Sequence, residues 1–143
     1  IEERLCEHPD VVLAAAVGQP DAHAGEVPMA SVVLREGSTV SAQALREFAA
    51  ERVPERAAAP VRIEIIPQMP MTAVGKIFKP RLRNLAIERV CAEVLHASGI
   101  KAAITVRPDN RLGTVATIRL GDAASRDAAT DALARLPIAI EFE

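Results

Sequence analysis

The chain has 143 residues, of which 50% are hydrophobic and 25% are charged, and its formal net charge is -2. These values suit one soluble domain, or one small domain with an appendage, and they exclude a disordered chain. No apolar run reaches the ~20 residues that a transmembrane helix needs, so we expect no membrane span. Aromatic residues make up only 2%, with no Trp or Tyr, which argues against a nucleic-acid surface built on base stacking.

Two cysteines, Cys6 and Cys91, lie far apart in the sequence. They form no disulfide framework, which is typical of a reducing compartment, so we expect a cytoplasmic protein. Neither they nor the three histidines have the spacing of a metal site, and no metal ligands are expected in this chain. The sequence begins on Ile1 rather than on an initiator methionine, which suggests a piece of a longer protein.

Apolar periodicity and turn residues predict the elements of the first half of the chain. The predicted order is a helix over 1–8, a strand over 10–18, a loop over 19–26, a strand over 28–35, a helix over 41–53 and a strand over 61–66. Pro9 ends the first helix because the residue before a proline is disfavoured in the α region. Ser41 is a good N-cap for the second helix.

The second half begins with a loop and a long amphipathic helix. The predicted order is a loop over 67–75, a helix over 79–97, a strand over 102–107, a turn over 108–113, a strand over 114–120, a helix over 122–136 and a strand over 138–142. Pro80 suits the start of the long helix. The interleaved elements predict an α+β fold, in which a small sheet of about three strands is flanked by helices and followed by a β-β-α-β extension.

One loop, Pro70–Lys79, has the composition of a functional site. Its glycine, Gly75, permits a positive φ, and Lys76 follows it directly. The stretch 76–89 holds five cations and one carboxylate, and an ammonium presented there can bind a phosphate or a carboxylate. From spacing alone, a solvated helix face is the more frequent explanation of such a cluster. A phosphate-binding P-loop is excluded, because Pro70 stands where that motif needs glycine.

The residues of this loop resemble the Pro-x-x-x-x-Gly-Lys signature near the C-terminus of AMP-forming acyl-CoA synthetases, which belong to the adenylate-forming superfamily. Four further segments resemble motifs of the same family in the same order: residues 1–11, Val17–Asp21, Gly25–Pro28 and 41–53. The resemblance covers residues 1–90. It implies that 1–90 is the family's mobile C-terminal domain and that 91–143 is an extension.

The resemblance implies a large N-terminal domain, outside this sequence, that holds the carboxylic acid and provides most of the contacts to ATP and Mg2+. The expected substrates are fatty acids. Lys76 would reach between the substrate carboxylate and the α-phosphate and stabilise the transition state of adenylation. The domain would then rotate, and the thiol of CoA would attack the acyl-adenylate. Thr72 and Gly75 would contribute to substrate or nucleotide binding. Three further cations would steer phosphates: Lys79, Arg81 and Arg83.

The sequence also departs from the family. Residues 57–60 read AAAP, whereas the family has a basic residue before this proline, so a contact made by that residue is in doubt. No Thr/Ser/Gly-rich phosphate loop occurs in the chain, so the fragment alone should have no ligase activity. Residues 91–143 carry no cluster of nucleophiles or ligands, and we expect them to serve oligomerisation, as in a homo-oligomer, or regulation.

Two alternatives remain open at this stage. The first is an adenylation domain that delivers its acyl group to a carrier protein instead of CoA. The second is a non-enzymatic module that binds an anionic partner through its basic surface at 76–89, although the low aromatic content argues against nucleic acid.

Overall fold

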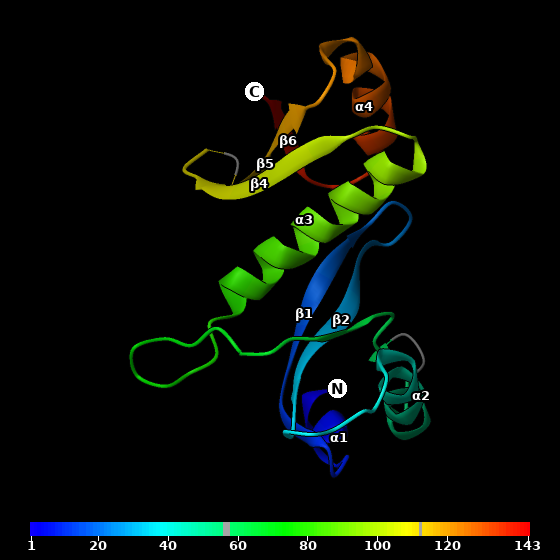
Figure 1. The fold of residues 1–143 in the computed structure, drawn as a ribbon, viewed down its shortest axis with the longest axis vertical. Coiled ribbons are helices and arrows are strands. Elements are labelled where there is room, and N and C mark those ends of the chain that lie inside the picture. The colour runs from blue at the N-terminus through cyan, green and yellow to red at the C-terminus, as the bar shows by residue number, and fades with distance from the viewer. Residues whose placement is uncertain (56–57, 112) are drawn as a thin grey trace. The chain divides into compact units, whose positions relative to one another are not determined.

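The structure, a computed structural model, describes residues 1–55, 58–111 and 113–143 (Figure 1). Its contacts divide the chain into two compact units. The first unit comprises Ile1–Gly18 and Val27–Leu82, and the second comprises Gln19–Glu26 and Arg83–Glu143. The AAAP departure begins at position 57, which lies outside the described residues. Both units are α+β, each with a three-stranded sheet, which confirms the predicted fold class.

The first unit is built on the sheet order β1-β2-β3. Its elements are α1 (Glu2–Cys6), β1 (Val11–Asp21), β2 (Gly25–Leu34), α2 (Ala42–Arg52) and β3 (Ile63–Ile65). β3 pairs parallel to β2, because α2 carries the chain back across the sheet between them. Ser41 caps α2, as predicted, by accepting a hydrogen bond from the Ala44 N–H at 3.1 Å.

The core of the first unit is apolar and closed by both short helices. Its buried members are Leu5, Val11, Ala14, Ala30, Val32, Leu45, Ala49 and Ile63. Leu5 of α1 and Leu45 of α2 are both 0% exposed. The buried apolar residues of α2 therefore lie on the face that packs against the sheet.

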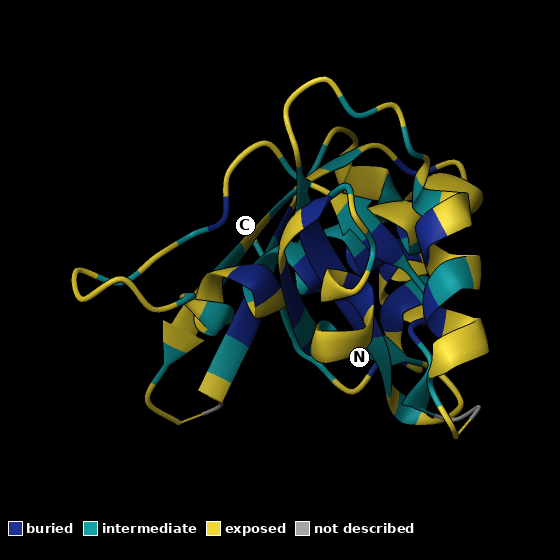
Figure 2. Ribbon diagram, turned by 90° about the horizontal axis from the view of Figure 1, so that it is seen from below, coloured by how far each residue is buried: buried dark blue, intermediate teal, exposed yellow. Residues whose placement is uncertain are grey.

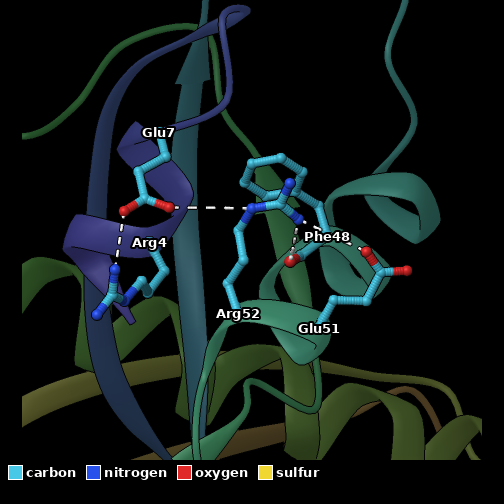
Figure 3. A network of polar contacts seen from close by, with 5 residues as sticks. All are labelled: Arg4, Glu7, Phe48, Glu51 and Arg52. Carbon is cyan, nitrogen blue, oxygen red and sulfur yellow. Dashed lines mark hydrogen bonds and ion pairs between the residues drawn. The ribbon is translucent and has the colours of Figure 1, made fainter.

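A polar network links α1 to α2 at the surface of this core (Figure 3). The Arg52 guanidinium lies 3.5 Å from the centre of the Phe48 ring and 3.9 Å from Glu7 Oε2. Glu7 also pairs with Arg4 of its own helix at 2.9 Å. These contacts link α1 and the residue that follows it to α2, although each exposed pair contributes only ~0.2–1 kcal/mol.

The second unit repeats the element order β-β-α-β. Its elements are the greater part of α3 (Lys79–Ala97), then β4 (Ala102–Asp109), β5 (Gly113–Leu120), the 3-10 turn η2 (Ala123–Ser125), α4 (Arg126–Leu133) and β6 (Ala139–Phe142). β4 and β5 are antiparallel, with Ile104 opposite Ile118, and β6 is parallel to β5. The predicted extension therefore has the expected order of elements.

The core of the second unit lies between its sheet and the helices α3 and α4. Its buried members are Val90, Cys91, Leu95, Ile100, Ala116, Ile118, Ala129, Leu133 and Leu136. Figure 2 shows how burial is distributed along the chain: buried residues lie mainly in strands and helices, and most loops are exposed. Within the described residues, no helix is both long and apolar enough to span a membrane.

Two predicted loops are shorter in the structure because strands continue into them. The loop predicted over 19–26 is wrong at both ends: β1 runs to Asp21 and β2 starts at Gly25. The Asp21 carboxylate accepts hydrogen bonds from the N–H groups of His23 and Ala24 at 3.0 and 2.8 Å. This local turn needs only three residues, so Gln19 and Pro20 remain in the strand.

The turn predicted over 108–113 is shortened for a related reason. Pro108 pairs in register with Thr114 and Asp109 with Gly113, so both strands extend into the predicted turn. A proline is tolerated there because β4 is an edge strand.

The helix predicted over 122–136 is also shorter than expected. Asp122 caps a separate 3-10 turn by accepting from the Ala124 N–H at 3.0 Å. α4 itself begins only at Arg126 and ends at Leu133.

Candidate functional site

The loop before α3 is a small hairpin, visible in Figure 1 as the green trace that leads into that helix. Met71 and Ile77 form an antiparallel bridge, and the Phe78 N–H donates to the Pro70 carbonyl at 2.8 Å. These contacts close the base of the hairpin. The tip, residues 72–76, is therefore held by backbone hydrogen bonds rather than by burial.

Thr72 organises the tip of the hairpin. Its N–H donates to the Lys76 carbonyl at 2.7 Å, and its Oγ1 accepts from the Lys76 N–H at 3.1 Å. Its carbonyl accepts from the Gly75 N–H at 3.0 Å. Thr72 thus bonds both backbone groups of Lys76 and fixes the backbone from which the lysine side chain extends.

Gly75 provides the backbone conformation that the hairpin requires. Its φ is +83°, in the left-handed region, and a Cβ added there would meet no atom within 4 Å. The restriction is therefore conformational and not steric. Three-residue hairpin loops commonly end on a residue of this kind.

Lys76 stands at the exposed tip of this hairpin. Within the described part of the chain, its ammonium makes no hydrogen bond or ion pair. The neighbouring Val74 is 80% exposed, and Met71 and Phe78 are 46% and 44% exposed. The loop thus presents one unpaired cation on a rim of exposed apolar side chains.

Lys79, three residues later, has a different environment. Its Nζ lies 2.6 Å from Glu2 Oε1, and the same oxygen accepts from the Ala16 N–H at 2.9 Å. Burial alone would raise the pKa of Glu2, but the hydrogen bonds from Lys79 and Ala16 and the charge of Lys79 outweigh it and lower that pKa. Both side chains of the pair are 39% exposed, so solvent screens it and its direct contribution to stability is at most ~1 kcal/mol.

Arg81 and Arg83 are exposed on α3. α3 passes from the first unit to the second between Leu82 and Arg83, so of these two arginines Arg81 belongs to the unit that carries the hairpin. The structure thus brings Thr72, Gly75 and Lys76 together in one loop, and it draws Lys79 into a contact with the N-terminal helix.

Glu2 is the residue that sequence reasoning missed. It lies 77 positions from Lys79, and no local pattern predicts that pair. The only signal was its place in the 1–11 segment that resembles the family. Among residues 1–55, 58–111 and 113–143, no group of three or more His, Cys, Asp or Glu side chains is arranged to hold a metal ion.

Comparison with known proteins places this geometry in a family. Residues 1–76 match the family described as the AMP-binding enzyme C-terminal domain. Among curated proteins, marinolic acid–CoA ligase of Pseudoalteromonas sp. is 42% identical over 129 residues, which cover 89% of this chain and 19% of that protein. Acetyl-coenzyme A synthetase of Deinococcus radiodurans is 42% identical over 86 residues, or 60% of this chain and 13% of that protein.

Solved structures of related enzymes also resemble this chain. An acyl-CoA synthetase from Brucella canis matches with a TM-score of 0.57 and 32% identity, over 62% of this chain and 17% of that one. The amide bond synthetase McbA from Marinactinospora thermotolerans matches with a TM-score of 0.55 and 36% identity, over 59% and 17%. The chain spans less than a fifth of the length of each of these relatives. With more than half of its residues matched, the chain belongs to the family of AMP-binding enzyme C-terminal domains.

Proposed function

We propose that this chain is the mobile C-terminal domain of an acid–CoA ligase and that Lys76 supplies the positive charge for adenylation. The observation that carries the proposal is the exposed Lys76 ammonium, which has no partner among the described residues and stands on an internally hydrogen-bonded hairpin. Residues 1–90 would form the lid over an N-terminal domain that binds ATP, Mg2+ and the acid. Residues 91–143 would form an extension of that lid.

The chemistry requires such a charge because the first step brings two anions together. A substrate carboxylate oxygen attacks the α-phosphorus of ATP, and pyrophosphate leaves with the electron pair of the broken P–O bond. Two unit charges 4 Å apart repel by about 4 kcal/mol at an effective dielectric constant of ~20. A preorganised ammonium between them offsets this repulsion and the charge that develops on the phosphoryl oxygens.

The second step needs the same lysine to be absent from the site. The thiolate of CoA would attack the carbonyl carbon of the acyl-adenylate, and AMP would leave. Withdrawal of the lid would remove Lys76 and open the path for the thiol. Thr72 and Gly75 would act in the first step by fixing the hairpin, and Arg81 and Arg83 would attract the phosphates of the incoming substrates.

We favour CoA over a carrier protein as the acceptor. The support is the similarity to marinolic acid–CoA ligase, which extends over 89% of this chain and so past the lid into the extension. A fatty or similarly apolar acid is our proposed substrate class. We propose a cytoplasmic location because ATP and CoA are available there and because both cysteines are free thiols.

The non-enzymatic binding module is the weaker alternative. Its basic surface would need several free cations between positions 76 and 89. Two of the five are already engaged: Lys79 pairs with Glu2, and Arg89 also has an interaction of its own. This leaves fewer charges for an anionic partner than the sequence suggested.

Lys76→Ala in the full-length enzyme tests the proposal. We expect acid-dependent pyrophosphate release to fall by about 10²–10³-fold, the usual effect of removing one preorganised charge or donor from a transition state. The formation of acyl-CoA from supplied acyl-adenylate should stay within about twofold of the wild type. An equal loss in both half-reactions would assign Lys76 to stability or to both steps and refute the proposed role.

A further inference from the structure

The base of the hairpin is attached to the first unit at two points with different chemistry. On the entry side, Met69 is 3% exposed and provides an apolar anchor directly before Pro70. On the exit side, Leu82 is 1% exposed, but it lies six residues beyond Lys76. Lys79 lies between them, three residues beyond Lys76, and its ammonium tethers the chain to Glu2 of α1.

That tether ends on one carboxylate oxygen that joins three segments. Glu2 Oε1 accepts from Lys79 Nζ at 2.6 Å and from the Ala16 N–H at 2.9 Å. Lys79 lies at the start of α3, Glu2 in α1 and Ala16 in β1, and all three belong to the first unit. One oxygen thus fixes the start of α3 against a helix and a strand that lie much earlier in the sequence.

The helix macrodipole makes the charge of Glu2 important. The first turn of α3 contains no acidic residue, and it begins with the cation Lys79. A positive side chain is unfavourable at a helix N-terminus, where backbone N–H groups already produce a partial positive charge. Glu2, which belongs to α1, supplies the negative charge that the first turn of α3 lacks. Its attraction keeps the Lys79 side chain against α1 instead of extended into solvent.

α1 is itself well enough anchored to serve as a support. Leu5 is fully buried in the core, and Glu7 meets Arg52, which lies over Phe48 of α2 (Figure 3). The support therefore leads from the core through α1 and Glu2 to the start of α3. From there it reaches the hairpin, whose last backbone hydrogen bond is made by Phe78.

We propose that Glu2 and Lys79 are positioning residues that hold the signature hairpin so that Lys76 enters the adenylation site in one orientation. The inference rests on the proposed function of Lys76. It gives Lys79 a role different from phosphate steering, since its ammonium is bound to Glu2. A positioning pair acts on the rate of the adenylation step and not on the affinity for ATP.

The experiment uses the full-length enzyme and measures both half-reactions. Glu2→Gln keeps an oxygen for the Ala16 N–H but removes the charge, and Lys79→Gln removes the cation. We expect each variant to lower kcat of adenylation by about 5–20-fold, with KM for ATP and the thioester-forming step within twofold of the wild type. The double variant should be no slower than either single variant, because both remove the same contact.

Two control variants separate positioning from other roles. Glu3→Gln changes the exposed neighbour of Glu2 in α1 and should leave both half-reactions unchanged. Lys79→Arg keeps a cation that reaches the carboxylate and should retain adenylation within about threefold.

The possible results are distinct. Equal losses in both half-reactions would show that the pair only stabilises the fold, and a raised KM for ATP in Lys79→Gln alone would show steering. Either result overturns the inference, as does unchanged adenylation in Glu2→Gln. If Lys76→Ala itself lacks a selective effect on adenylation, the proposed function fails, whereas a selective Lys76→Ala with inert Glu2→Gln rejects the positioning role alone.

Discussion

The two cysteines carry the same thiol in opposite environments. Cys6 is exposed at the end of α1, whereas Cys91 is buried among the apolar residues of the second unit. Burial raises the pKa of the Cys91 thiol from its ordinary value of 9.0 to about 11, because the thiolate is poorly solvated there. The reactive species is the thiolate, so the two residues should differ strongly in alkylation.

We predict that iodoacetamide at pH 8 modifies Cys6 rapidly and leaves Cys91 unmodified until the chain unfolds. Peptide mass spectrometry after timed quenching measures both residues in one sample, and a parallel reaction in denaturant is the control. Comparable labelling rates of the two cysteines in the folded chain would contradict the burial of Cys91.

The same pKa shift links stability to pH. Above pH 9 the unfolded chain loses the Cys91 proton while the folded chain keeps it until about pH 11, so the unfolded state binds fewer protons. The free energy of unfolding therefore falls as pH rises from 9 to 11, by up to about 2–3 kcal/mol. Cys91→Ala should remove this part of the pH dependence in denaturant titrations. A wild type and variant with parallel pH profiles would be inconsistent with the shift.

Lys76 and Lys79 show how far residue-level prediction from sequence reaches. The motif singled out Lys76 as the adenylation lysine, and this role stays a prediction; the structure shows the residue exposed on the hairpin. Lys79 has the same side chain in the same basic stretch, but its ammonium is bound to Glu2. Local spacing cannot distinguish the two lysines, because Glu2, which binds Lys79 and not Lys76, comes from a distant part of the chain.

At the scale of elements, the hairpin 70–78 depends on Gly75. We predict that Gly75→Ala lowers the adenylation rate more than Gly75→Asn does, because a φ of +83° strains alanine by ~1–2 kcal/mol and asparagine by less. No steric clash complicates the comparison, since the space around a Cβ at this position is open. The measurement is acid-dependent pyrophosphate release by the two variants of the full-length enzyme. Equal rates for alanine and asparagine would show that the left-handed conformation is not required.

Element types were predictable from sequence, whereas several ends were not. The prediction for α3 was confirmed at both ends, Lys79 and Ala97, because it has a long periodic apolar face and a proline in its first turn. The predicted ends of β1 and β4 were wrong, because Pro20 and Pro108 suggested loops where the strands continue. Both prolines lie inside strands, and the pairing of β4 with β5 continues past Pro108 to Asp109 and Gly113. Such pairing is a tertiary property that composition does not reveal.

At the scale of the whole molecule, the chain contains two units with separate cores. The buried residues of the two clusters do not overlap, and the family match over residues 1–76 contains no residue of the second core. Both units have the element order β-β-α-β, although the sequence shows no internal repeat. The division between residues 1–90 and 91–143 remains a prediction.

The chain spans 19% of the length of the ligase it resembles over 129 residues. Under the proposed function, the reaction would need groups from other parts of the full-length enzyme, and the first unit would contribute the hairpin with Lys76. The proposed function requires an ammonium at the end of a side chain of lysine's length at position 76.

Chemical rescue in the full-length enzyme tests that claim most directly. In a Cys6→Ser background, Lys76→Cys should lower adenylation by about 10²–10³-fold. With 2-bromoethylamine, the introduced thiolate displaces bromide and gains an aminoethyl group that ends in an ammonium. Cys91 should remain unmodified because it is buried and its pKa is about 11. Mass spectrometry reports the extent of modification, and the Cys6→Ser enzyme with Lys76 intact, treated in parallel, is the control.

We predict that the alkylated enzyme recovers adenylation to within about tenfold of the treated control, while the thioester-forming step is unchanged throughout. Complete alkylation without recovery, or full adenylation activity in Lys76→Cys before alkylation, would contradict the account.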